Sequence, residues 1–414
     1  MQKRRIHNTN ENIPLLGFGA MRFPTKNGLI DRKKSIKLIE HSINQGANFI
    51  DTAYLYHGGE SEIFLGELLS ERRLRDKVLL STKLPVWIVK KEEDLEKYLD
   101  EQLYRLKTDY LDYYFLHSLN KETYDFLKTI NVEGFLDKIK ESGKVKHVGF
   151  SYHDNYDSFC EIIDSYPWDV CLVQYNLIDN DVQVTDKGVE YADEKGVNVI
   201  VMEPLKGGLL VNKLPKPVLQ TMKNNNITES PAKWALKWVV NNPHVSCVLS
   251  GMKTIDQIDE NIDICNTTFA NQLTDDELEV YSEVKKMYNA LLKIQCTQCN
   301  YCKPCPFNVD IPTCFELYNH KHLFNDRALL FTYYFRTSGV TGGVPMYAGL
   351  CKKCRKCMKH CPQKLDIITE LELVKREFEF PGFKYVAPTV MKIGGPMANV
   401  STKIWQKISK YLNK

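Results

Sequence analysis

The stretch Asn48-Phe-Ile-Asp51-Thr-Ala-Tyr-Leu-Tyr56-His-Gly-Gly-Glu-Ser-Glu62 carries the pattern from which the fold of the N-terminal part is predicted. It joins a short apolar run, residues 48–50, to a polar segment. The apolar run has the length and composition of a buried strand. Helix-period patterns follow and precede such runs, so the stretch is typical of one β-then-α unit.

The same pattern recurs along roughly the first 285 residues. Eight strands are predicted, at Leu15–Gly17, Asn48–Ile50, Val78–Ser81, Leu111–Leu116, Val148–Phe150, Val170–Val173, Val197–Val201 and Cys247–Leu249. Eight β-then-α units in one run favour an α/β fold whose parallel sheet closes on itself, a (β/α)8 TIM barrel. The alternative is an open doubly wound sheet. It would need a glycine-rich phosphate loop, and Gly17-Phe-Gly19 is not completed to GxGxxG.

An N-terminal hairpin is predicted before the first strand. Arg4–His7 and Ile13–Leu15 flank an Asn-rich segment at residues 8–12, which is typical of a tight turn. We expect this hairpin to cap the N-terminal end of the barrel.

The length and net charge of the chain limit the classes of protein to which it can belong. The chain has 414 residues, which is a barrel of about 250 residues plus a further module. A net charge of +3, with no basic cluster interleaved with aromatics, gives no reason to expect a nucleic-acid partner. No apolar run approaches the roughly 18 residues of a membrane span, and no signal-peptide core follows the basic start. The sequence predicts a cytoplasmic protein without a transmembrane segment.

Polar residues follow the predicted strands where a barrel places its catalytic groups. Asp51 and Tyr56 follow the second strand, and Lys83, His117, Ser151 and Gln174 follow the next four in order. In these residues the chain resembles the aldo-keto reductase family over residues 1–285. The catalytic tetrad of that family corresponds to Asp51, Tyr56, Lys83 and His117.

The resemblance implies carbonyl reduction or alcohol oxidation by proton and hydride transfer. A free tyrosine has a pKa near 10 and is a poor acid at neutral pH. The Lys83 ammonium would stabilise the Tyr56 phenolate and lower that pKa, and Asp51 would hold Lys83 charged. Tyr56 would then act as general acid in reduction and base in oxidation, while His117 orients the substrate oxygen. Tyr54 has the wrong offset and is predicted to be a pocket-wall or core residue.

The family resemblance also implies the residues that bind NAD(H) or NADP(H). Ser151 and Gln174 would hold the carboxamide, but Tyr152 stands where the family has Asn. His153 and Asn155 are the nearby substitutes. After the seventh strand the family's stacking tyrosine is replaced, so the predicted nicotinamide platform is Met202 with Pro204 and Leu205.

The adenosine end of the cofactor is expected at Gly251, Lys253, Gln257 and Asn261. Relatives that prefer NADP have Lys-Ser and then Arg at the positions of Gly251, Met252 and Gln257, so two cations are missing here, and Lys253 is the obvious cation left in this segment. We therefore expect use of NAD(H), or of both nucleotides.

The C-terminal part is dominated by cysteines. Nine of the 13 lie between Cys296 and Cys361, which does not fit the disulfide framework of a small secreted domain. The second group matches the bacterial ferredoxin pattern C-x2-C-x2-C-x3-C-P in full. The first has x2 before its last cysteine. Because each run ends in Cys-Pro, two [4Fe–4S] clusters are favoured over zinc.

In ferredoxins the fourth cysteine of each run reaches the other cluster. The first predicted ligand set is therefore Cys296, Cys299, Cys302 and Cys361, and the second is Cys351, Cys354, Cys357 and Cys305. Cys314 is expected to be a buried structural thiol. The predicted module spans residues 286–380 and is mostly helical. A tail at 381–414 contains a basic amphipathic helix, Asn399–Lys414, expected to pack on the protein itself, with a partner or a membrane surface as the alternative.

Two functions remain open on the sequence alone. The first is an iron–sulfur oxidoreductase of the aldo-keto reductase type. It would act on a small carbonyl or alcohol and exchange electrons with a one-electron carrier such as a ferredoxin or a flavoprotein. The alternative is a redox-sensing or docking subunit in which the barrel binds nicotinamide without turnover.

Overall fold

The computed structural model describes residues 1–7, 11–325, 329–339, 344–380 and 383. The chain separates into two compact units. The first contains Met1–Leu214 and Thr221–Glu283, and the second contains Pro215–Gln220 and the described residues from Val284 onward. The predicted tail helix at 399–414 lies outside the described residues.

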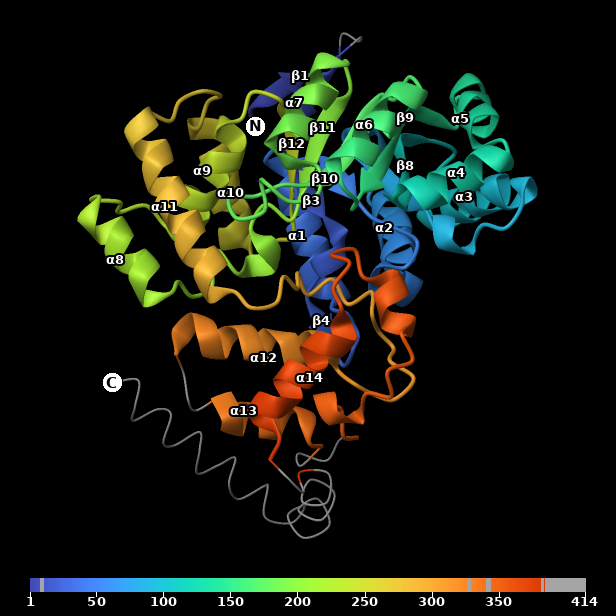
Figure 1. Ribbon diagram of the computed structural model, residues 1–414. Coiled ribbons are helices and arrows are strands. Elements are labelled where there is room, and N and C mark those ends of the chain that lie inside the picture. The colour runs from blue at the N-terminus through green and yellow to red at the C-terminus, as the bar shows by residue number, and fades with distance from the viewer. Residues whose placement is uncertain (8–10, 326–328, 340–343, 381–382, 384–414) are drawn as a thin grey trace. The chain divides into compact units, whose positions relative to one another are not determined.

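The first unit is a closed barrel of eight parallel strands (Figure 1). Their order around the barrel is β10-β11-β12-β3-β6-β7-β8-β9. The strands are β3 (Leu16–Gly19), β6 (Phe49–Asp51), β7 (Leu79–Leu84), β8 (Leu111–Leu119), β9 (Val145–Tyr152), β10 (Val170–Gln174), β11 (Asn198–Met202) and β12 (Val245–Ser250). All eight predicted strands are present, and closure of the sheet excludes the doubly wound alternative.

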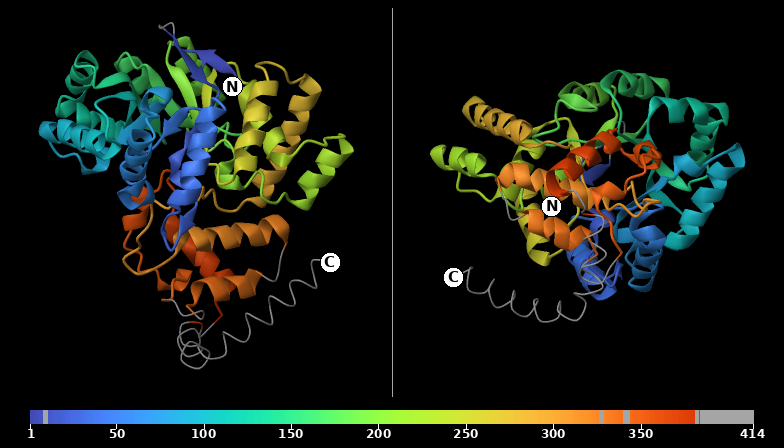
Figure 2. Two further views of the ribbon diagram at one scale, coloured as in Figure 1. Left: turned by 180° about the vertical axis from the view of Figure 1, so that it is seen from behind. Right: turned by 60° about the horizontal axis from the view of Figure 1, so that its bottom comes forward.

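Helices surround the strands of this unit, as both views of Figure 2 show. Those entirely within the first unit are α1 (Arg32–Asn44), α2 (Glu60–Glu71), α3 (Glu92–Leu106), α4 (Lys121–Thr129), α5 (Val132–Glu141), α6 (Tyr156–Ser165), α7 (Thr185–Glu194), α9 (Pro231–Asn241) and α10 (Ile255–Thr267). Helices α8 (Lys216–Asn224) and α11 (Asp275–Leu291) span the unit boundaries. Each helix buries one apolar stripe; in α3 the stripe includes Leu95, Leu99 and Leu103.

The predicted hairpin closes the N-terminal end of the barrel. Strands β1 (Lys3–Arg5) and β2 (Asn12–Pro14) pair antiparallel, and residues 8–10, where a turn is predicted, lie outside the described residues. Ile6 and Ile13 belong to the same buried cluster as the barrel-interior residue Phe49. The opposite end of the barrel, where the strands finish, carries the candidate active site.

The second unit is mostly helical, as predicted. It contains α12 (Ile311–Phe324), α13 (Leu329–Thr337) and α14 (Ile367–Phe378), with short 3-10 turns at Ala348–Leu350 and Lys356–His360. Tyr333 stacks on Phe378 with ring centroids 4.6 Å apart, in the middle of its core.

An internal repeat organises this unit. Cys305-Pro-Phe-Asn-Val-Asp-Ile-Pro-Thr313 and Cys361-Pro-Gln-Lys-Leu-Asp-Ile-Ile-Thr369 share the spacing Cys-Pro-x-x-x-Asp-Ile-x-Thr. Asp310 accepts a hydrogen bond from the Thr313 N–H at 3.3 Å and caps α12. Asp366 caps α14 in the same way, at 3.4 Å from the Thr369 nitrogen. Each cysteine run is therefore followed by an equivalent capped helix.

In the part of the chain that the structure describes, no helix has the length and apolar character needed to cross a membrane.

Candidate active site and cysteine pockets

A buried ion pair joins the ends of two neighbouring strands. Lys83 Nζ donates to both carboxylate oxygens of Asp51 at 2.7 Å and to the Thr52 carbonyl at 2.7 Å. The Lys83 and Asp51 residues are 1% and 3% exposed. Burial lowers the pKa of Lys83, and the charge of Asp51 acts in the opposite direction. Asp51 thus opposes loss of the Lys83 charge in a site that excludes water.

Tyr56 and His117 lie beside this ion pair. Tyr56 starts a 3-10 turn, Tyr56–Gly59, after β6, and its ring centroid is 4.9 Å from Lys83 Nζ. The His117 ring centroid is 6.2 Å from that of Tyr56. All four residues of the predicted tetrad are therefore brought together. Tyr54 points elsewhere: its hydroxyl donates to Glu101 at 3.1 Å.

His117 is held neutral by its surroundings. Burial keeps its pKa well below the ordinary value, and the charges of Lys83 and His153 lower that pKa further. Burial also lowers the pKa of His153 to about 4. The Trp87 ring lies 5.0 Å from that of His117 and is 39% exposed, so it forms one wall beside the tetrad. Sequence reasoning did not assign Trp87. Its position four residues past Lys83, in the loop after a strand, was the available signal.

A buried polar network supports Lys83 from the side of helices α2 and α3. Glu62 accepts hydrogen bonds from Thr82 and Gln102 at 2.6 Å each and pairs with Arg105 at 3.2 Å. The Gln102 amide also donates to the backbone carbonyl of Lys83 at 3.0 Å. Glu62 is a second carboxylate that raises the pKa of Lys83. No motif in the sequence indicated this network, because its members come from three separate elements.

Close approach of these two helices depends on a glycine. A Cβ at Gly66 would lie 2.2 Å from the backbone oxygen of Arg105. A side chain at this position would therefore push α3 away and separate Arg105 from Glu62.

The predicted carboxamide residue Gln174 is anchored by a second buried ion pair. Its Nε2 donates to Asp179 at 2.8 Å, and Lys206 Nζ lies 2.5 and 2.6 Å from the two Asp179 oxygens. Lys206 and Asp179 are both 3% exposed. This arrangement turns the Gln174 nitrogen toward Asp179 and its oxygen away. Sequence reasoning missed Asp179 and Lys206, although both follow strand ends.

The other residues considered for binding the carboxamide make hydrogen bonds to neighbouring residues of the protein. The Ser151 hydroxyl oxygen accepts from the Ser118 N–H at 2.7 Å. The Tyr152 hydroxyl, buried, lies 2.6 Å from the Ser158 hydroxyl. The Asn155 side chain accepts from the Ser158 N–H at 3.1 Å and caps α6. Among the residues that follow Ser151, His153 is therefore the nearest one that makes neither a helix-capping contact nor a core contact of this kind.

The loops after β11 and β12 lie on either side of Arg22. Met202 ends β11 half-buried, Pro204 is buried and Leu205 is half-buried. Arg22 pairs with Glu203 at 3.3 Å, and a Cβ on Gly251 would lie 3.0 Å from the Arg22 side chain. Arg22 is thus a cation close to the predicted adenosine end, in addition to Lys253.

Of the predicted adenosine residues, Lys253 lies just before α10, and Gln257 and Asn261 lie within it. The Lys253 N–H donates to the Gln257 side chain at 2.8 Å, and both residues are exposed. Asn261 is buried and donates to the Ser250 hydroxyl at 3.1 Å.

The Asp179–Lys206 pair gives a stability prediction. Lys206→Met should lower the free energy of unfolding by about 3–5 kcal/mol, because Asp179 is left as a buried unpaired charge. Urea unfolding of the full chain, followed by circular dichroism, measures this. Lys253→Met, at an exposed lysine, is the control and should change stability by less than about 0.5 kcal/mol. Equal losses in the two variants would contradict the role assigned to the pair.

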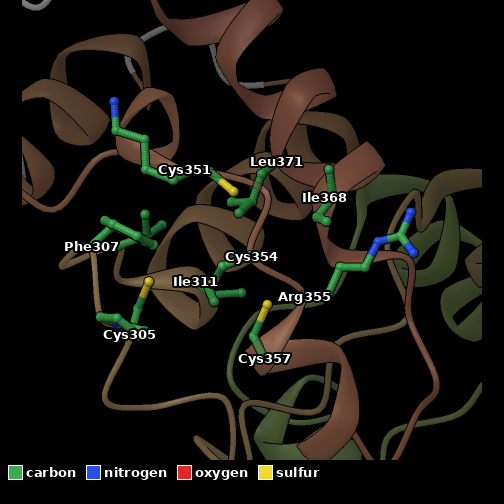
Figure 3. Close-up of a pocket in the computed structure, with 12 residues that line it drawn as sticks. Cys305, Phe307, Ile311, Cys351, Cys354, Arg355, Cys357, Ile368 and Leu371 are labelled. Atoms are coloured by element: carbon green, nitrogen blue, oxygen red, sulfur yellow. The ribbon is translucent and has the colours of Figure 1, made fainter.

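The eight motif cysteines of the second unit line two pockets, four in each. Cys296, Cys299, Cys302 and Cys361 line one. Cys305, Cys351, Cys354 and Cys357 line the other (Figure 3). In Figure 3 the sulfurs of Cys305, Cys351 and Cys357 face a common space. These are the two sets in which the fourth cysteine of each run crosses to the other group.

The donor chemistry of both pockets suits a cationic metal cluster. Burial raises the pKa of Cys302, and the neighbouring thiolates of Cys299, Cys296 and Cys361 raise it further. Burial and the second set of thiolates raise the pKa of Cys357 to about 11. Four thiolates in an apolar pocket repel one another, so iron must neutralise them for all four to be ionised together.

Zinc would bind these groups differently. One zinc ion draws four ligands onto a single centre, whereas a cubane spreads four thiolates over four irons. Among the described residues, no three His, Cys, Asp or Glu side chains are placed to hold a single metal ion.

Cys314 lies apart from both sets. It is fully buried on α12, with its sulfur 3.9 Å from the Tyr333 hydroxyl. Its burial agrees with the structural role predicted for it.

A closed parallel barrel with an Asp–Lys–Tyr–His cluster where its strands end defines a TIM-barrel protein with a candidate active site, here joined to a cysteine-rich helical module. Comparison with known proteins names the family. The sequence profile "Aldo/keto reductase family" matches residues 15–285, and "4Fe-4S dicluster domain" matches residues 295–365. The chain belongs to the aldo/keto reductase family and carries a 4Fe-4S dicluster domain. It is an oxidoreductase of that family.

The alignments of this chain with individual relatives cover most of the length of each relative. L-galactose dehydrogenase of Arabidopsis thaliana is 28% identical over 63% of this chain and 87% of its own. NADH-specific methylglyoxal reductase of Escherichia coli is 23% identical over 66% of this chain and 95% of its own. The solved aldo-keto reductase of Bacillus halodurans in its holo form shares the fold, with a TM-score of 0.58, 24% identity and coverage of 69% of this chain and 96% of that one.

Proposed function

We propose that the barrel reduces a small carbonyl compound with NAD(P)H, or oxidises the corresponding alcohol. The observation that supports this most strongly is the buried Asp51–Lys83 pair beneath Tyr56 and His117. When bound, a reduced nicotinamide would supply the hydride to the carbonyl carbon. Tyr56 gives its hydroxyl proton to the carbonyl oxygen. The carbonyl thus gains one hydride and one proton and becomes an alcohol, and Tyr56 is left as a phenolate.

The neighbouring residues make Tyr56 competent for this step. Lys83, kept charged by Asp51, stabilises the phenolate that Tyr56 becomes after proton loss. Neutral His117 donates a hydrogen bond to the substrate oxygen and so orients the carbonyl. Trp87 supplies an apolar wall for the substrate.

The nucleotide would lie across the ends of the strands. Ser151 and Gln174 hold the carboxamide, and the Asp179–Lys206 pair keeps the Gln174 amide in one orientation. Met202, Pro204 and Leu205 would contact the nicotinamide. Gly251, Lys253, Gln257 and Asn261 bind the adenosine end. The E. coli relative is named as NADH-specific, which supports NAD(H), and the cations Lys253 and Arg22 allow NADP(H) as well.

The two cysteine sets are proposed to hold one [4Fe–4S] cluster each. The fit rests on two pockets of four thiolates and on the repeat that builds them. A cluster exchanges one electron at a time, whereas a hydride carries two. We therefore propose that the clusters exchange electrons with an external one-electron carrier such as a ferredoxin or a flavoprotein. We assign residues 1–285 to the barrel, 286–380 to the iron–sulfur module and 381–414 to a tail.

Turnover by the full chain tests the barrel's function. Anaerobically purified protein is mixed with NADH or NADPH and a panel of aldehydes and ketones. Carbonyl-dependent oxidation of at least one nucleotide supports the proposal. Tight nucleotide binding without turnover of any carbonyl would contradict it and favour the sensing alternative.

The lowered pKa of His117 predicts that the rate of carbonyl reduction does not fall as the pH is lowered to about 6. Because His117 stays neutral down to well below its ordinary pKa of about 6.5, kcat/KM for reduction should not change through histidine protonation between about pH 6 and pH 8. Steady-state rates across this range measure the effect. An inflection near pH 6.5 that disappears in His117→Gln would show that the pKa is not lowered.

A further inference from the structure

The loop of the second cysteine run is strongly basic. Between Cys351 and Cys361 lie five Lys or Arg residues and no acidic residue. We call them the basic rim: Lys352, Lys353, Arg355, Lys356 and Lys359. All five are exposed, and so is Cys354 between them. The rim thus surrounds the edge at which the second thiolate set reaches solvent.

The rim borders that pocket directly. Lys352 and Arg355 line it together with the four thiolates. In Figure 3 the guanidinium of Arg355 extends away from the sulfurs, so its charge does not pair with a thiolate.

The fold does not require these cations. The first cysteine loop has left-handed backbone at the two matching positions: Gln298 and Asn300 have φ of 62° and 66°, and the equivalent Lys353 and Arg355 have 56° and 63°. At the four matching positions the first loop carries neutral residues, namely Thr297, Gln298, Asn300 and Tyr301. A left-handed loop of this kind therefore forms without positive charge, and the rim needs another explanation.

Nearby carboxylates only partly offset the rim. Glu372 lies 3.4 Å from Lys353 and also pairs with Lys375 at 3.9 Å. Arg355 lowers the pKa of Asp366 only as the last of several causes, after hydrogen bonds to Thr369. The five cations of the basic rim outnumber these two carboxylates, so the surface beside Cys354 is positively charged.

We propose that the basic rim docks an acidic one-electron carrier protein. This proposal rests on the assignment of a [4Fe–4S] cluster to the second thiolate set. One electron leaves the reduced centre of the carrier, which is oxidised, and enters the group held by Cys305, Cys351, Cys354 and Cys357, which is reduced. No proton moves and no bond is formed or broken. In the reverse direction the carrier is reduced.

Charge and size both suit such a carrier. Opposite charge speeds association by 10-fold to 1,000-fold and orients the partners, which suits short-lived complexes. Electron-transfer interfaces lie at the small end of the size range, so one loop is large enough to guide docking. An anionic membrane would also be attracted, but the position of the basic rim around an exposed ligand cysteine favours a partner that exchanges electrons there.

A loop swap tests the proposal. In the full-length holoprotein, Lys352→Thr, Lys353→Gln, Arg355→Asn and Lys356→Tyr give the second loop the residues of the first. The control removes four charges from exposed lysines of the first unit, by Lys33→Gln, Lys37→Gln, Lys97→Gln and Lys223→Gln. The probe is an acidic bacterial two-cluster ferredoxin. Its oxidised form is used for titration calorimetry and its photoreduced form for stopped-flow electron transfer.

The wild type and the control should bind the ferredoxin alike, and binding should weaken as salt rises. The swap should slow association by at least about 10-fold, with unchanged iron content and unchanged reduction by a photoreduced deazaflavin. If the swap loses iron, Lys356→Gln with Lys359→Gln is used and should slow association severalfold.

Equal ferredoxin binding by the wild type and the swapped chain would overturn the proposal. So would tighter binding of phosphatidylserine vesicles than of ferredoxin, lost in the swap, which would assign the rim to a membrane. NAD(P)H-dependent carbonyl turnover should be the same in all variants. Failure of docking with turnover intact therefore leaves the barrel's function standing, and absence of iron would instead refute the cluster assignment.

Discussion

Tyr56→Phe should lower kcat for carbonyl reduction by about 1,000-fold, within the range that general acid catalysis supplies. Phenylalanine keeps the ring whose centroid lies 4.9 Å from Lys83 Nζ but has no proton to give to the carbonyl oxygen. Because the buried Asp51–Lys83 pair is unchanged, the nucleotide should still bind with near wild-type affinity. Steady-state rates and a fluorescence titration of NADH or NADPH measure the two effects separately.

The matched control is Tyr54→Phe, two residues away. The Tyr54 hydroxyl donates to Glu101 and not to the tetrad, so this variant should keep kcat within about threefold of wild type. Similar rates for Tyr56→Phe and wild type, or an equal loss in the two variants, would remove Tyr56 from its proposed role.

Cys302→Ala should reduce the iron content from about eight to about four atoms per chain. Cys302 lines the first pocket with three other cysteines, and burial first and then their charges raise its pKa. Removing one of four ligands from a cubane should leave that cluster unstable, whereas the second set keeps all its thiolates. Iron and sulfide analysis of anaerobically purified protein, together with its visible absorbance, gives the result.

Cys314→Ala is the control for cysteine removal in the same unit. Cys314 is buried but lines neither pocket, so this variant should keep about eight irons. Iron loss from Cys314→Ala equal to that from Cys302→Ala would show that the ligand sets are assigned wrongly.

The barrel was predictable because each strand carries its own local signal. A run such as Val170–Val173 is apolar and short, and the polar residue that follows it marks the strand end. The tetrad was proposed from the resemblance to the aldo-keto reductase family. The structure brings its four members close together, and their catalytic roles stay predictions. The cysteine sets follow from fixed spacing, and the structure collects them in two pockets.

The supporting contacts were not predictable in this way. Lys206 reaches Asp179 across 27 positions of sequence, and Glu62 reaches Gln102 across 40. Such pairs depend on how neighbouring elements pack, which no local periodicity records. Tyr152, which stands where the family has Asn, is a further case: its hydroxyl lies within hydrogen-bonding distance of the buried Ser158 hydroxyl, a contact that no pattern in the sequence indicated. The repeat around Asp310 and Asp366 was visible in the sequence and became meaningful once both were seen to cap helices.

Hydride transfer in the barrel is the central claim, and isotope transfer tests it most directly. The full-length holoprotein is mixed anaerobically with NADH or NADPH deuterated at the transferable position and with a carbonyl that it turns over. Mass spectrometry then locates the label in the alcohol. We predict one deuterium on the carbinol carbon for each nucleotide oxidised, and far slower labelling in Tyr56→Phe. Oxidation of the nucleotide without deuterium in the alcohol would contradict direct hydride transfer.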